Sequence, residues 1–375
     1  MSVLFIHNTM PEYRIPFFIG LKKKINVDYL FTDINLSKKI YGYKSAQKDK
    51  LAFEVLSGGF GRVFKLKNLI GQKKYRQIIL PPMDSLKGFF DCFIILIFGK
   101  INKSKLLYFG EKWEAPKKTQ PIKKKIKNLI QRLAFKFILK EVDMCIVSGY
   151  KSEQFFKSIG IDDKNISIAI DSSGVNEINN CIDIKKERQI SSDCKIILYY
   201  GRIIRRKGLD ILIKAYERLK IKYQNICLFI CGEGDYKKEC EILVDELNLK
   251  DVFFEGYIDP CNKYVYFSQC NIFVLPSYFY MGIPEAWGLT VNEALQCGKP
   301  VIATKAVGSA YDLLDGNNGV MIESNNINEL ANAIEEFLFN RYEKEVSEAC
   351  IKQYKKYNYD NMINGFINAI DKCYE

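Results

Sequence analysis

The sequence predicts an α/β protein built from two doubly wound domains, each around a parallel sheet. The chain of 375 residues is too long for one domain of ordinary size, and an apolar content of 48% supplies two cores. Short β-rich runs alternate with helical runs in both halves, which is typical of parallel sheets. A polar, weakly patterned segment at 176–193 separates the halves. We therefore expect one domain over 1–180 and another over 190–358, with a last helix at about 359–375 that returns to the first domain.

The candidate strands are short runs rich in β-branched and aromatic residues. In the first half they lie at 3–7, 27–32, 77–80, 106–109, 143–148 and 166–170. In the second half they lie at 195–200, 226–230, 252–255, 271–275 and 301–303. Glycine and charged residues directly follow several of the second set. Open α/β sheets bind their ligands at the carboxyl ends of strands, so we expect a site there.

Composition argues against several other classes of protein. Lysines 22–24 follow the first strand instead of preceding an apolar run, so no signal peptide is expected. The most apolar stretch, 88–101, contains Asp91 and is shorter than the ~20 residues that a membrane-spanning helix needs. The 12 cysteines lie singly, without a CxxC pair, and the chain has one histidine, His7. We therefore expect free thiols in a reducing cytoplasm and no metal site.

The positive charge is concentrated in the first half of the chain. Residues 1–190 contain 35 Lys or Arg against 18 Asp or Glu, whereas residues 191–375 contain 21 against 26. The first half is therefore expected to face something anionic, either nucleic acid or a membrane surface. No nucleic-acid-binding motif accompanies the charge, so nucleic acid is not an expected partner.

Residues 117–140 predict a basic amphipathic helix. This range holds nine Lys or Arg and no acid. Six apolar residues fall on one stripe at helical spacing, namely Ile122, Ile126, Leu129, Ile130, Leu133 and Phe137. Such a helix can lie on an anionic membrane surface. A helix that packs on a domain core needs the same stripe, so the sequence leaves both alternatives open.

The stretch 276–304 has the layout of an anion site between two acids. Glu285 lies just ahead of a predicted helix start, and Glu293 lies eight residues later, inside that helix. A helix start offers N–H groups and the positive end of its dipole to an anion. The two carboxylates can accept hydrogen bonds from hydroxyls on either side, as in a sugar joined to ribose through a diphosphate. The spacing alone is also compatible with two glutamates that bind no ligand, because glutamate is favoured near helix starts.

Several short motifs of the second half occur together in one order. They are Gly201-Arg202, Lys207-Gly208, Gly232-Glu233-Gly234, Phe254-Glu255-Gly256-Tyr257, Pro276-Ser277, Glu285 and Glu293, and then Gly308, Asp312, Gly316 and Gly319. With this set, the region from about 195 to 325 resembles the donor-binding domain of retaining glycosyltransferases of family 4. The resemblance implies the GT-B fold, in which two Rossmann-like domains face a central cleft.

The resemblance also implies roles for individual residues. Arg202 and Lys207 would hold the diphosphate of a nucleotide sugar, and Glu285 would bind hydroxyls of the donor sugar. Fixed cations can stabilise a leaving group that gains negative charge, without a metal. The further donor-binding residues are Glu293 at the ribose, Gly288, Leu289 and Thr290 at phosphate or sugar, Gly232 and Gly234 through their backbone, and Tyr257 near the base. A tight turn explains the glycines at 232 and 234 equally well, and the arginines at 205 and 206 are expected to be solvated.

The opening of the chain resembles the first loop and helix of some members of this family. The matching residues are His7-Asn8, Pro11, Tyr13-Arg14 and Pro16-Phe17-Phe18. Many relatives carry an active-site His after a middle strand of the first domain, and this chain has none there. Glu111, Lys112 or Trp113 is expected to line the acceptor side instead, together with Tyr13 and Arg14. A tryptophan suits the face of a sugar, although a structural role is an equal alternative.

Together these observations predict a retaining transferase that moves a hexosyl-type sugar from a UDP- or GDP-sugar to a cell-envelope glycan or a lipid-linked saccharide. By the resemblance, a phosphate oxygen takes the acceptor proton, so neither a cofactor nor a protein nucleophile is required. We expect the enzyme in the cytoplasm, at the inner face of the cell membrane. The alternatives are a sugar-nucleotide epimerase, a phosphorylase with a cofactor lysine, and a non-catalytic binding subunit of the same fold.

Overall fold

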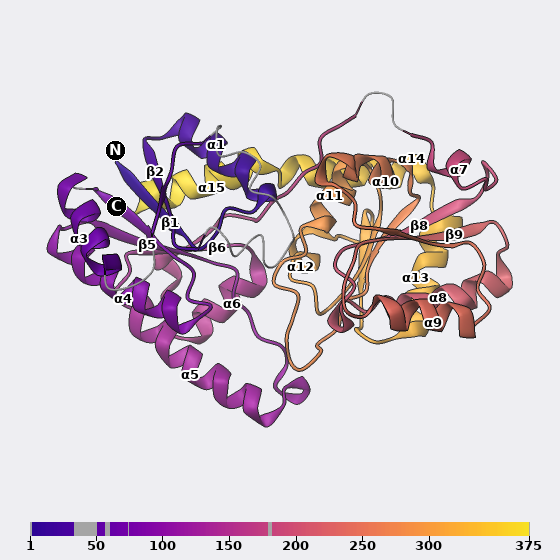
Figure 1. Ribbon diagram of the computed structural model, residues 1–375, viewed down its shortest axis with the longest axis horizontal. Helices are drawn as coiled ribbons and strands as arrows, with labels where there is room; N and C mark the ends of the chain where they lie inside the picture. Colours follow the sequence, from indigo (N-terminus) through magenta and orange to yellow (C-terminus); the bar gives the residue numbers. More distant parts are fainter. Residues whose placement is uncertain (1, 34–50, 57–60, 74, 179–181, 375) are drawn as a thin grey trace. The chain divides into compact units, whose positions relative to one another are not determined.

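A computed structural model (Figure 1) describes residues 2–33, 51–56, 61–73, 75–178 and 182–374 of the chain. The described residues form two compact units. The first unit comprises Met1–Trp113, Ile122–Asp171 and Tyr359–Glu375, and the second comprises Glu114–Pro121 and Ser172–Asn358. The segment Glu114–Pro121 thus departs from the expected division at 180, because its buried Gln120 packs against Gly282 of the second unit.

The described part of the first unit contains one parallel sheet with the strand order β3-β2-β1-β4-β5-β6-β7. Its strands are β1 (Val3–His7), β2 (Val27–Phe31), β3 (Glu54–Val55), β4 (Gln77–Leu80), β5 (Lys105–Gly110), β6 (Met144–Val147) and β7 (Ile166–Ile168). All six predicted runs are strands, with ends that differ by no more than two residues. β3 was not predicted, because a strand of two residues carries no readable pattern.

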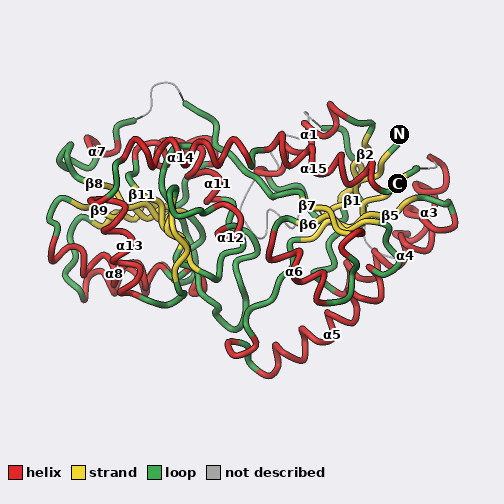
Figure 2. The backbone as a smooth tube through the Cα atoms, turned by 180° about the vertical axis from the view of Figure 1, so that it is seen from behind, coloured by secondary structure: helices red, strands yellow, loops and turns green. Residues whose placement is uncertain are grey.

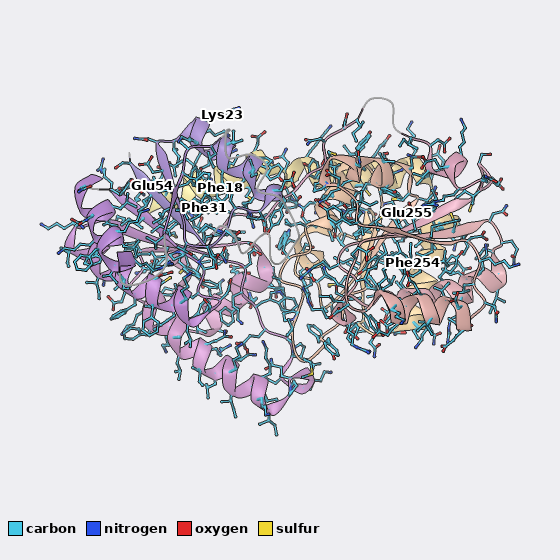
Figure 3. The ribbon with its side chains drawn as sticks, in the orientation of Figure 1. Phe18, Lys23, Phe31, Glu54, Phe254 and Glu255 are labelled. Carbon is cyan, nitrogen blue, oxygen red and sulfur yellow. The ribbon has the colours of Figure 1, made fainter. Side chains whose placement is uncertain are left out.

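Helices and an aromatic core complete the first unit. The helices are α1 (Ile15–Lys24), α3 (Gly61–Lys73), α4 (Leu86–Ile101), α5 (Ile122–Leu139), α6 (Tyr150–Ser158) and α15 (Tyr359–Lys372). The rings of Phe18 and Phe31, labelled in Figure 3, lie 5.5 Å apart. Phe366 of α15 packs 4.7 Å from Phe17 of α1, so the last helix of the chain supplies part of this core.

The second unit has a second parallel sheet with the strand order β10-β9-β8-β11-β12-β13 among its described residues. The strands are β8 (Lys195–Tyr200), β9 (Ile226–Cys231), β10 (Val252–Gly256), β11 (Ile272–Leu275), β12 (Val301–Thr304) and β13 (Gly319–Ile322). The helices are α7 (Ile184–Glu187), α8 (Leu209–Lys222), α9 (Lys237–Glu246), α10 (Lys263–Gln269), α11 (Thr290–Gln296), α12 (Ala310–Leu313), α13 (Ile327–Glu335) and α14 (Glu343–Lys356). The short helix α7 lies in the expected linker, where Asp183 caps it, while 179–181 lie outside the described residues.

Six strands follow the same order in both sheets, and the first sheet adds β7 at one edge. The strands of each unit are drawn in yellow in Figure 2. The strand order reverses between β1 and β4 in the first unit and between β8 and β11 in the second. Doubly wound sheets bind ligands at such a switch point, at the carboxyl ends of the strands. Within the described parts of the chain, no helix combines the length and apolar character that spanning a bilayer requires.

Candidate active site

The loops after β8 and β11 bring three charged side chains of the second unit together. Arg206 and Lys207 lie in a short 3-10 turn after β8, and Glu285 lies in the loop after β11. Oε2 of Glu285 accepts a hydrogen bond from Nζ of Lys207 at 2.8 Å and another from Nη1 of Arg206. Because β8 and β11 are neighbours at the switch point, residues nearly 80 positions apart meet at one carboxylate.

Close backbone contact holds the two loops in this arrangement. Gly208 has a φ of +70°, and a Cβ at this position would lie 2.1 Å from the carbonyl oxygen of Pro276. A residue with a side chain would therefore both strain the backbone and push the loops apart. The N–H of Tyr278 also donates to the carbonyl oxygen of Arg206 at 2.9 Å. The glycine that follows Lys207 in the sequence motif thus fixes the distance between the two halves of the cluster.

The cluster carries more positive than negative charge. Burial opposes ionisation of Glu285, yet the charges of Lys207 and Arg206 hold its pKa at about 2. Burial lowers the pKa of Lys207, and the charges of Arg206 and Arg202 lower it further against the attraction of Glu285. Arg202, exposed directly after β8, is therefore close enough for its charge to act on Lys207. Such a site can accept an anion with more than one negative charge.

The expectation that Arg206 is solvated is wrong. Its side chain is 19% exposed and pairs with Glu285. The neighbouring Arg205 is 51% exposed, with its guanidinium 4.4 Å from the ring centre of Tyr236. Successive residues of a 3-10 turn project about 120° apart, so adjacent arginines point to different surroundings. The sequence does not reveal which of the two turns inward.

Glu293 forms a second buried group in α11. Its side chain is enclosed, and Oε1 accepts hydrogen bonds from Oγ of Ser173 and from Nζ of Lys263, both at 2.8 Å. Oε2 is buried without a hydrogen-bond partner among the described residues. An unsatisfied buried carboxylate oxygen costs free energy, so it marks a place where a ligand hydroxyl would be favourable. Ser173 and Lys263 were not predicted, and no local sequence pattern identifies them.

The protein's own packing accounts for two of the predicted glycines. A Cβ on Gly232 would lie 1.9 Å from the carbonyl oxygen of Gly201, and a Cβ on Gly234 would lie 2.1 Å from that of Ile203. The tight turn is therefore sufficient to explain both glycines, without a contact between their backbone and a sugar donor. Gly288 has a φ of +96° and is enclosed by Leu275 and Val307. Leu289 and Thr290 are half-buried at the start of α11, and Tyr257 is 54% exposed after β10.

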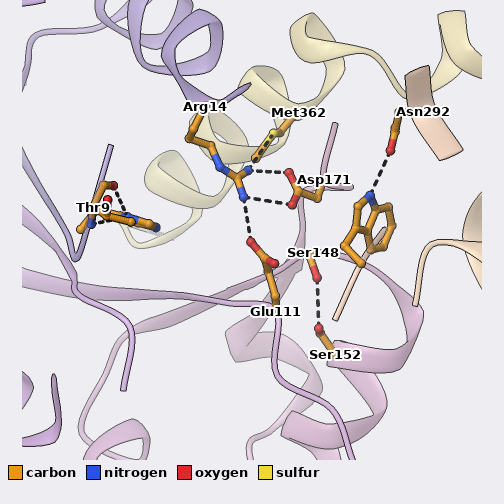
Figure 4. Close-up of polar contacts among 10 residues, drawn as sticks. Thr9, Arg14, Glu111, Ser148, Ser152, Asp171, Asn292 and Met362 are labelled. Atoms are coloured by element: carbon orange, nitrogen blue, oxygen red, sulfur yellow. Dashed lines mark hydrogen bonds and ion pairs between the residues drawn. The ribbon is translucent and has the colours of Figure 1, made fainter. Parts of the chain in front are cut away.

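In the first unit, one arginine joins two carboxylates at the carboxyl edge of the sheet (Figure 4). Nη1 and Nη2 of Arg14 donate to the two carboxylate oxygens of Asp171 at 2.5 and 3.0 Å. Nη2 also donates to Oε1 of Glu111 at 2.7 Å. Arg14 follows β1, Glu111 follows β5 and Asp171 follows β7. Parallel strands gather these side chains because their carboxyl ends lie along one edge.

The charge balance of this cluster is opposite to that of the Glu285 cluster. Arg14 is 3% exposed and Asp171 is fully enclosed, whereas the side chain of Glu111 is 31% exposed. Burial and the negative charge of Asp171 raise the pKa of Glu111 to about 8, against the effect of Arg14. Burial and the charge of Arg14 lower the pKa of His7 to about 4. His7 is therefore neutral near pH 7, with Nδ1 donating to the carbonyl oxygen of Thr9 at 2.8 Å.

Two of the predicted acceptor-side residues are covered by protein. Trp113 is 4% exposed, and Nζ of Lys151 lies 5.0 Å from its ring centre, so the structural alternative holds for this tryptophan. The guanidinium of Arg14 is engaged with its two carboxylates and orients Glu111 rather than facing a ligand itself. Glu111 and the half-buried Tyr13 keep exposed surface. Asp171 was missed, because a lone acid after a strand is common in any sequence.

No group of three or more His, Cys, Asp or Glu side chains arranged to hold a metal ion occurs among the described residues. The described cysteines are free thiols, and most of them are buried.

The two parallel-sheet units, each with doubly wound order, define the GT-B α/β fold. The crystal structure of Anabaena HepE in complex with UDP superposes with a TM-score of 0.78 over 99% of this chain and 100% of that chain, at 18% identity. This similarity establishes the fold. Residues 182–357 match the family described as "Glycosyl transferases group 1". The match covers 176 of the 375 residues and lies within the second unit, whose sequence is thus similar to the group 1 glycosyl transferases.

Several proteins with similar sequences carry glycosyltransferase names. The "Uncharacterized glycosyltransferase MJ1059" of Methanocaldococcus jannaschii is 26% identical over 285 residues, which cover 74% of this chain and 66% of that protein. The "N-acetylgalactosamine-N,N'-diacetylbacillosaminyl-diphospho-undecaprenol 4-alpha-N-acetylgalactosaminyltransferase" of Campylobacter jejuni is 26% identical over 220 residues, covering 58% of this chain and 56% of that protein. The alignments thus span less than two thirds of the length of both relatives.

Proposed function

We propose that the protein is a retaining glycosyltransferase of family 4 that moves a hexosyl-type sugar from a UDP- or GDP-sugar to a saccharide acceptor. The observation that carries the proposal is the sharing of one carboxylate, that of Glu285, by Arg206 and Lys207 at the switch point of the unit that is similar to the group 1 glycosyl transferases. Excess positive charge next to a fixed carboxylate suits a diphosphate joined to a sugar.

In this proposal the diphosphate binds against Lys207 and Arg206, with Arg202 at the exposed side. Their charges stabilise the nucleoside diphosphate as it leaves, because negative charge develops on its terminal oxygens. The same cations hold Glu285 in place and keep its pKa near 2, so it is ionised at neutral pH. An ionised, immobilised carboxylate can accept hydrogen bonds from the donor sugar. The backbone of 288–290 is proposed to approach the phosphate or sugar from the start of α11.

Glu293 is proposed to bind the ribose of the donor. Its unsatisfied Oε2 would accept a ribose hydroxyl, while Ser173 and Lys263 hold Oε1. The charge of Lys263 partly offsets the cost of burying the carboxylate before the donor arrives. Lys263 is therefore proposed as a positioning residue of the donor site.

The transfer step needs no group from outside the donor and the acceptor. The bond from the anomeric carbon to the diphosphate oxygen breaks, the bond to the acceptor oxygen forms on the same face, and the acceptor proton passes to the departing phosphate. Three cationic side chains supply the charge stabilisation that a metal would otherwise give, so we propose metal-independent transfer. Glu111, which has exposed surface and a pKa raised to about 8, is proposed to hydrogen-bond an acceptor hydroxyl.

The acceptor is proposed to be a cell-envelope glycan or a lipid-linked saccharide, and the enzyme is proposed to work at the cytoplasmic face of the membrane. The basic first half of the chain supports an anionic surface nearby. The name of the Campylobacter relative, which includes a diphospho-undecaprenol-linked saccharide, supports the acceptor class.

Transfer assays with defined donors test the proposal. The purified protein is incubated with UDP-glucose, UDP-N-acetylgalactosamine or GDP-mannose and with extracted polyprenyl-diphosphate-linked saccharides, and mass spectrometry follows the sugar into the lipid fraction. Lys207→Ala and Glu285→Gln should each lower transfer by about 100-fold or more. Arg205→Ala, next to the cluster but outside it, is the matched control and should retain activity.

The result also separates the alternatives. Conversion of the donor sugar without an acceptor would favour an epimerase, and phosphate-dependent release of a sugar phosphate would favour a phosphorylase. Transfer by Lys207→Ala at the wild-type rate would overturn the assignment of this cluster.

A further inference from the structure

The apolar stripe of α5 faces solvent instead of the core. Its members are 50–75% exposed, and they are Ile122, Ile126, Leu129, Ile130, Leu133 and Phe137. The helix is anchored instead through Phe135, Ile138 and Leu139, which are buried at its C-terminal end. The alternative that the sequence left open, in which this stripe packs on the core, is therefore wrong.

A second apolar stripe lies on α4, next to the first. Its members recur every three or four residues and are 37–80% exposed, and they are Leu86, Phe90, Phe93, Ile97 and Ile101. Cys92, Ile95 and Gly99 of the same helix point into the protein. The ring of Phe93 stacks on that of Phe137 at 6.2 Å, which joins the two stripes. α4 and α5 run side by side in Figure 1, and we call their two stripes together the α4–α5 face.

The α4–α5 face is bordered by cations and shows no exposed acid on either helix. α5 contains six Lys or Arg and no acid, namely Lys123, Lys124, Lys125, Lys127, Arg132 and Lys136. The acid of α4, Asp91, is buried and paired with Arg62 of α3. The surface therefore combines contiguous exposed apolar side chains, which mark an interaction site, with an excess of positive over negative charge on the two helices.

We infer that the α4–α5 face docks on an anionic phospholipid surface, with its apolar stripes inserted among the lipids. A second copy of the chain would place two cationic faces together, and the charges would repel. An anionic bilayer satisfies both components, because apolar side chains enter the acyl boundary while lysine and arginine side chains reach the phosphates. The inference stands on exposure and charge, and it does not depend on the proposed transfer reaction.

Vesicle co-sedimentation with two kinds of variants tests the inference. The vesicles contain phosphatidylcholine alone or phosphatidylcholine mixed with phosphatidylglycerol. Leu129→Asn combined with Leu133→Asn should weaken binding to the mixed vesicles by about 10-fold or more. Each substitution removes a leucine side chain whose insertion into the bilayer contributes roughly 1 kcal/mol to the binding free energy. Ile221→Asn, on α8 and 80% exposed, is the matched control and should bind like the wild type.

A pair of triple lysine variants tests the contribution of positive charge to vesicle binding. Replacing Lys123, Lys125 and Lys127 by Gln should weaken binding by about 100-fold, since each basic residue near an anionic surface contributes about 1 kcal/mol. Replacing lysines 22–24 of α1 by Gln removes the same charge elsewhere, and Lys23 projects from α1 away from the sheet (Figure 3). This control should keep most of the binding.

Three outcomes would overturn the inference. They are equal binding to vesicles with and without phosphatidylglycerol, unchanged binding by the Leu129 and Leu133 double variant, and equal losses in both lysine triples. Self-association that the double variant abolishes, without vesicle binding, would assign the face to a second copy instead. The substituted side chains are exposed, so unfolding midpoints should match the wild type, and vesicle binding is read without any nucleotide sugar.

Discussion

The charged clusters of the two units lie at the carboxyl edge of two parallel sheets that share the order of six strands, yet their charge balance is opposite. In the first unit a single cation, Arg14, pairs with Glu111 and Asp171. In the second unit a single carboxylate, Glu285, pairs with Arg206 and Lys207. The pKa of Glu111 is accordingly raised to about 8, while that of Glu285 is lowered to about 2.

This difference shows what the shared topology does and does not fix. A doubly wound sheet determines where polar side chains gather, because parallel strands end along one edge. The residues after each strand determine which charge the gathered site can accept. The Glu285 cluster has positive charge to spare for an anion, whereas the Arg14 cluster has a carboxyl that can hold a proton near neutral pH. Four predictions test this contrast.

The largest expected effect is on stability. Arg14→Met leaves the enclosed carboxylate of Asp171 without its cation and should cost the first unit about 3–5 kcal/mol. Lys207→Met should cost the second unit less, about 1–3 kcal/mol, because Arg206 still pairs with Glu285. Urea unfolding by fluorescence can separate the units, with Trp113 reporting on the first and Trp287 on the second in the respective single-tryptophan backgrounds. Equal losses in both variants would contradict the contrast.

The second effect is on transfer. Arg206→Gln removes one of the two cations that touch Glu285 and should lower kcat/KM about 100-fold, with a smaller effect on the unfolding midpoint. Arg205→Gln is the control from the adjacent position, where the side chain stacks on Tyr236, and kcat/KM should stay near the wild-type value. Comparable losses in the two variants would show that general surface charge, and not the pairing with Glu285, is responsible.

The third effect is on the pH dependence of stability. A carboxyl whose pKa is about 8 in the folded protein and 4.5 when unfolded keeps its proton longer in the folded state. Its contribution to the free energy of unfolding therefore falls as pH rises from about 4.5 to about 8. Glu111→Gln lacks this titration, so the stability of the variant relative to the wild type should increase over that window. Parallel profiles for the two proteins would show that Glu111 does not titrate in this range.

The smallest expected effect concerns metal ions. If Arg202, Arg206 and Lys207 supply the charge stabilisation, addition of EDTA should leave the rate of sugar transfer unchanged. Loss of activity with EDTA and recovery with Mg²⁺ or Mn²⁺ would mean that the three cations are insufficient for the leaving group.

Much of the fold and part of the site could be predicted from the sequence. The buried strands are short apolar runs bounded by glycine and charged residues, so their positions follow from local patterns. The resemblance to family 4 glycosyltransferases assigned the motif residues Lys207 and Glu285 to one site. Their contact at 2.8 Å agrees with that assignment. Local pattern was therefore sufficient for the positions of the strands.

The sequence did not identify four residues of the charged clusters, namely Arg206, Lys263, Ser173 and Asp171. Each acts through the direction of its side chain and through a partner far along the chain, as with Ser173 and Glu293, which are 120 positions apart. Local sequence does not show the direction of a side chain, because that direction depends on the rotation of the turn. It does not show the distant partner either, because the partner depends on which loops meet.

The α5 helix shows the same division most clearly. The sequence by itself determined that 122–139 is helical, amphipathic and basic, since these properties follow from the spacing of its residues. Only the tertiary structure decided that the stripe of Leu129 and Leu133 is exposed, because Phe135, Ile138 and Leu139 occupy the core position that the stripe could have taken. Amphipathic spacing fixes that a helix has an apolar side, and packing against the rest of the chain fixes which side is buried.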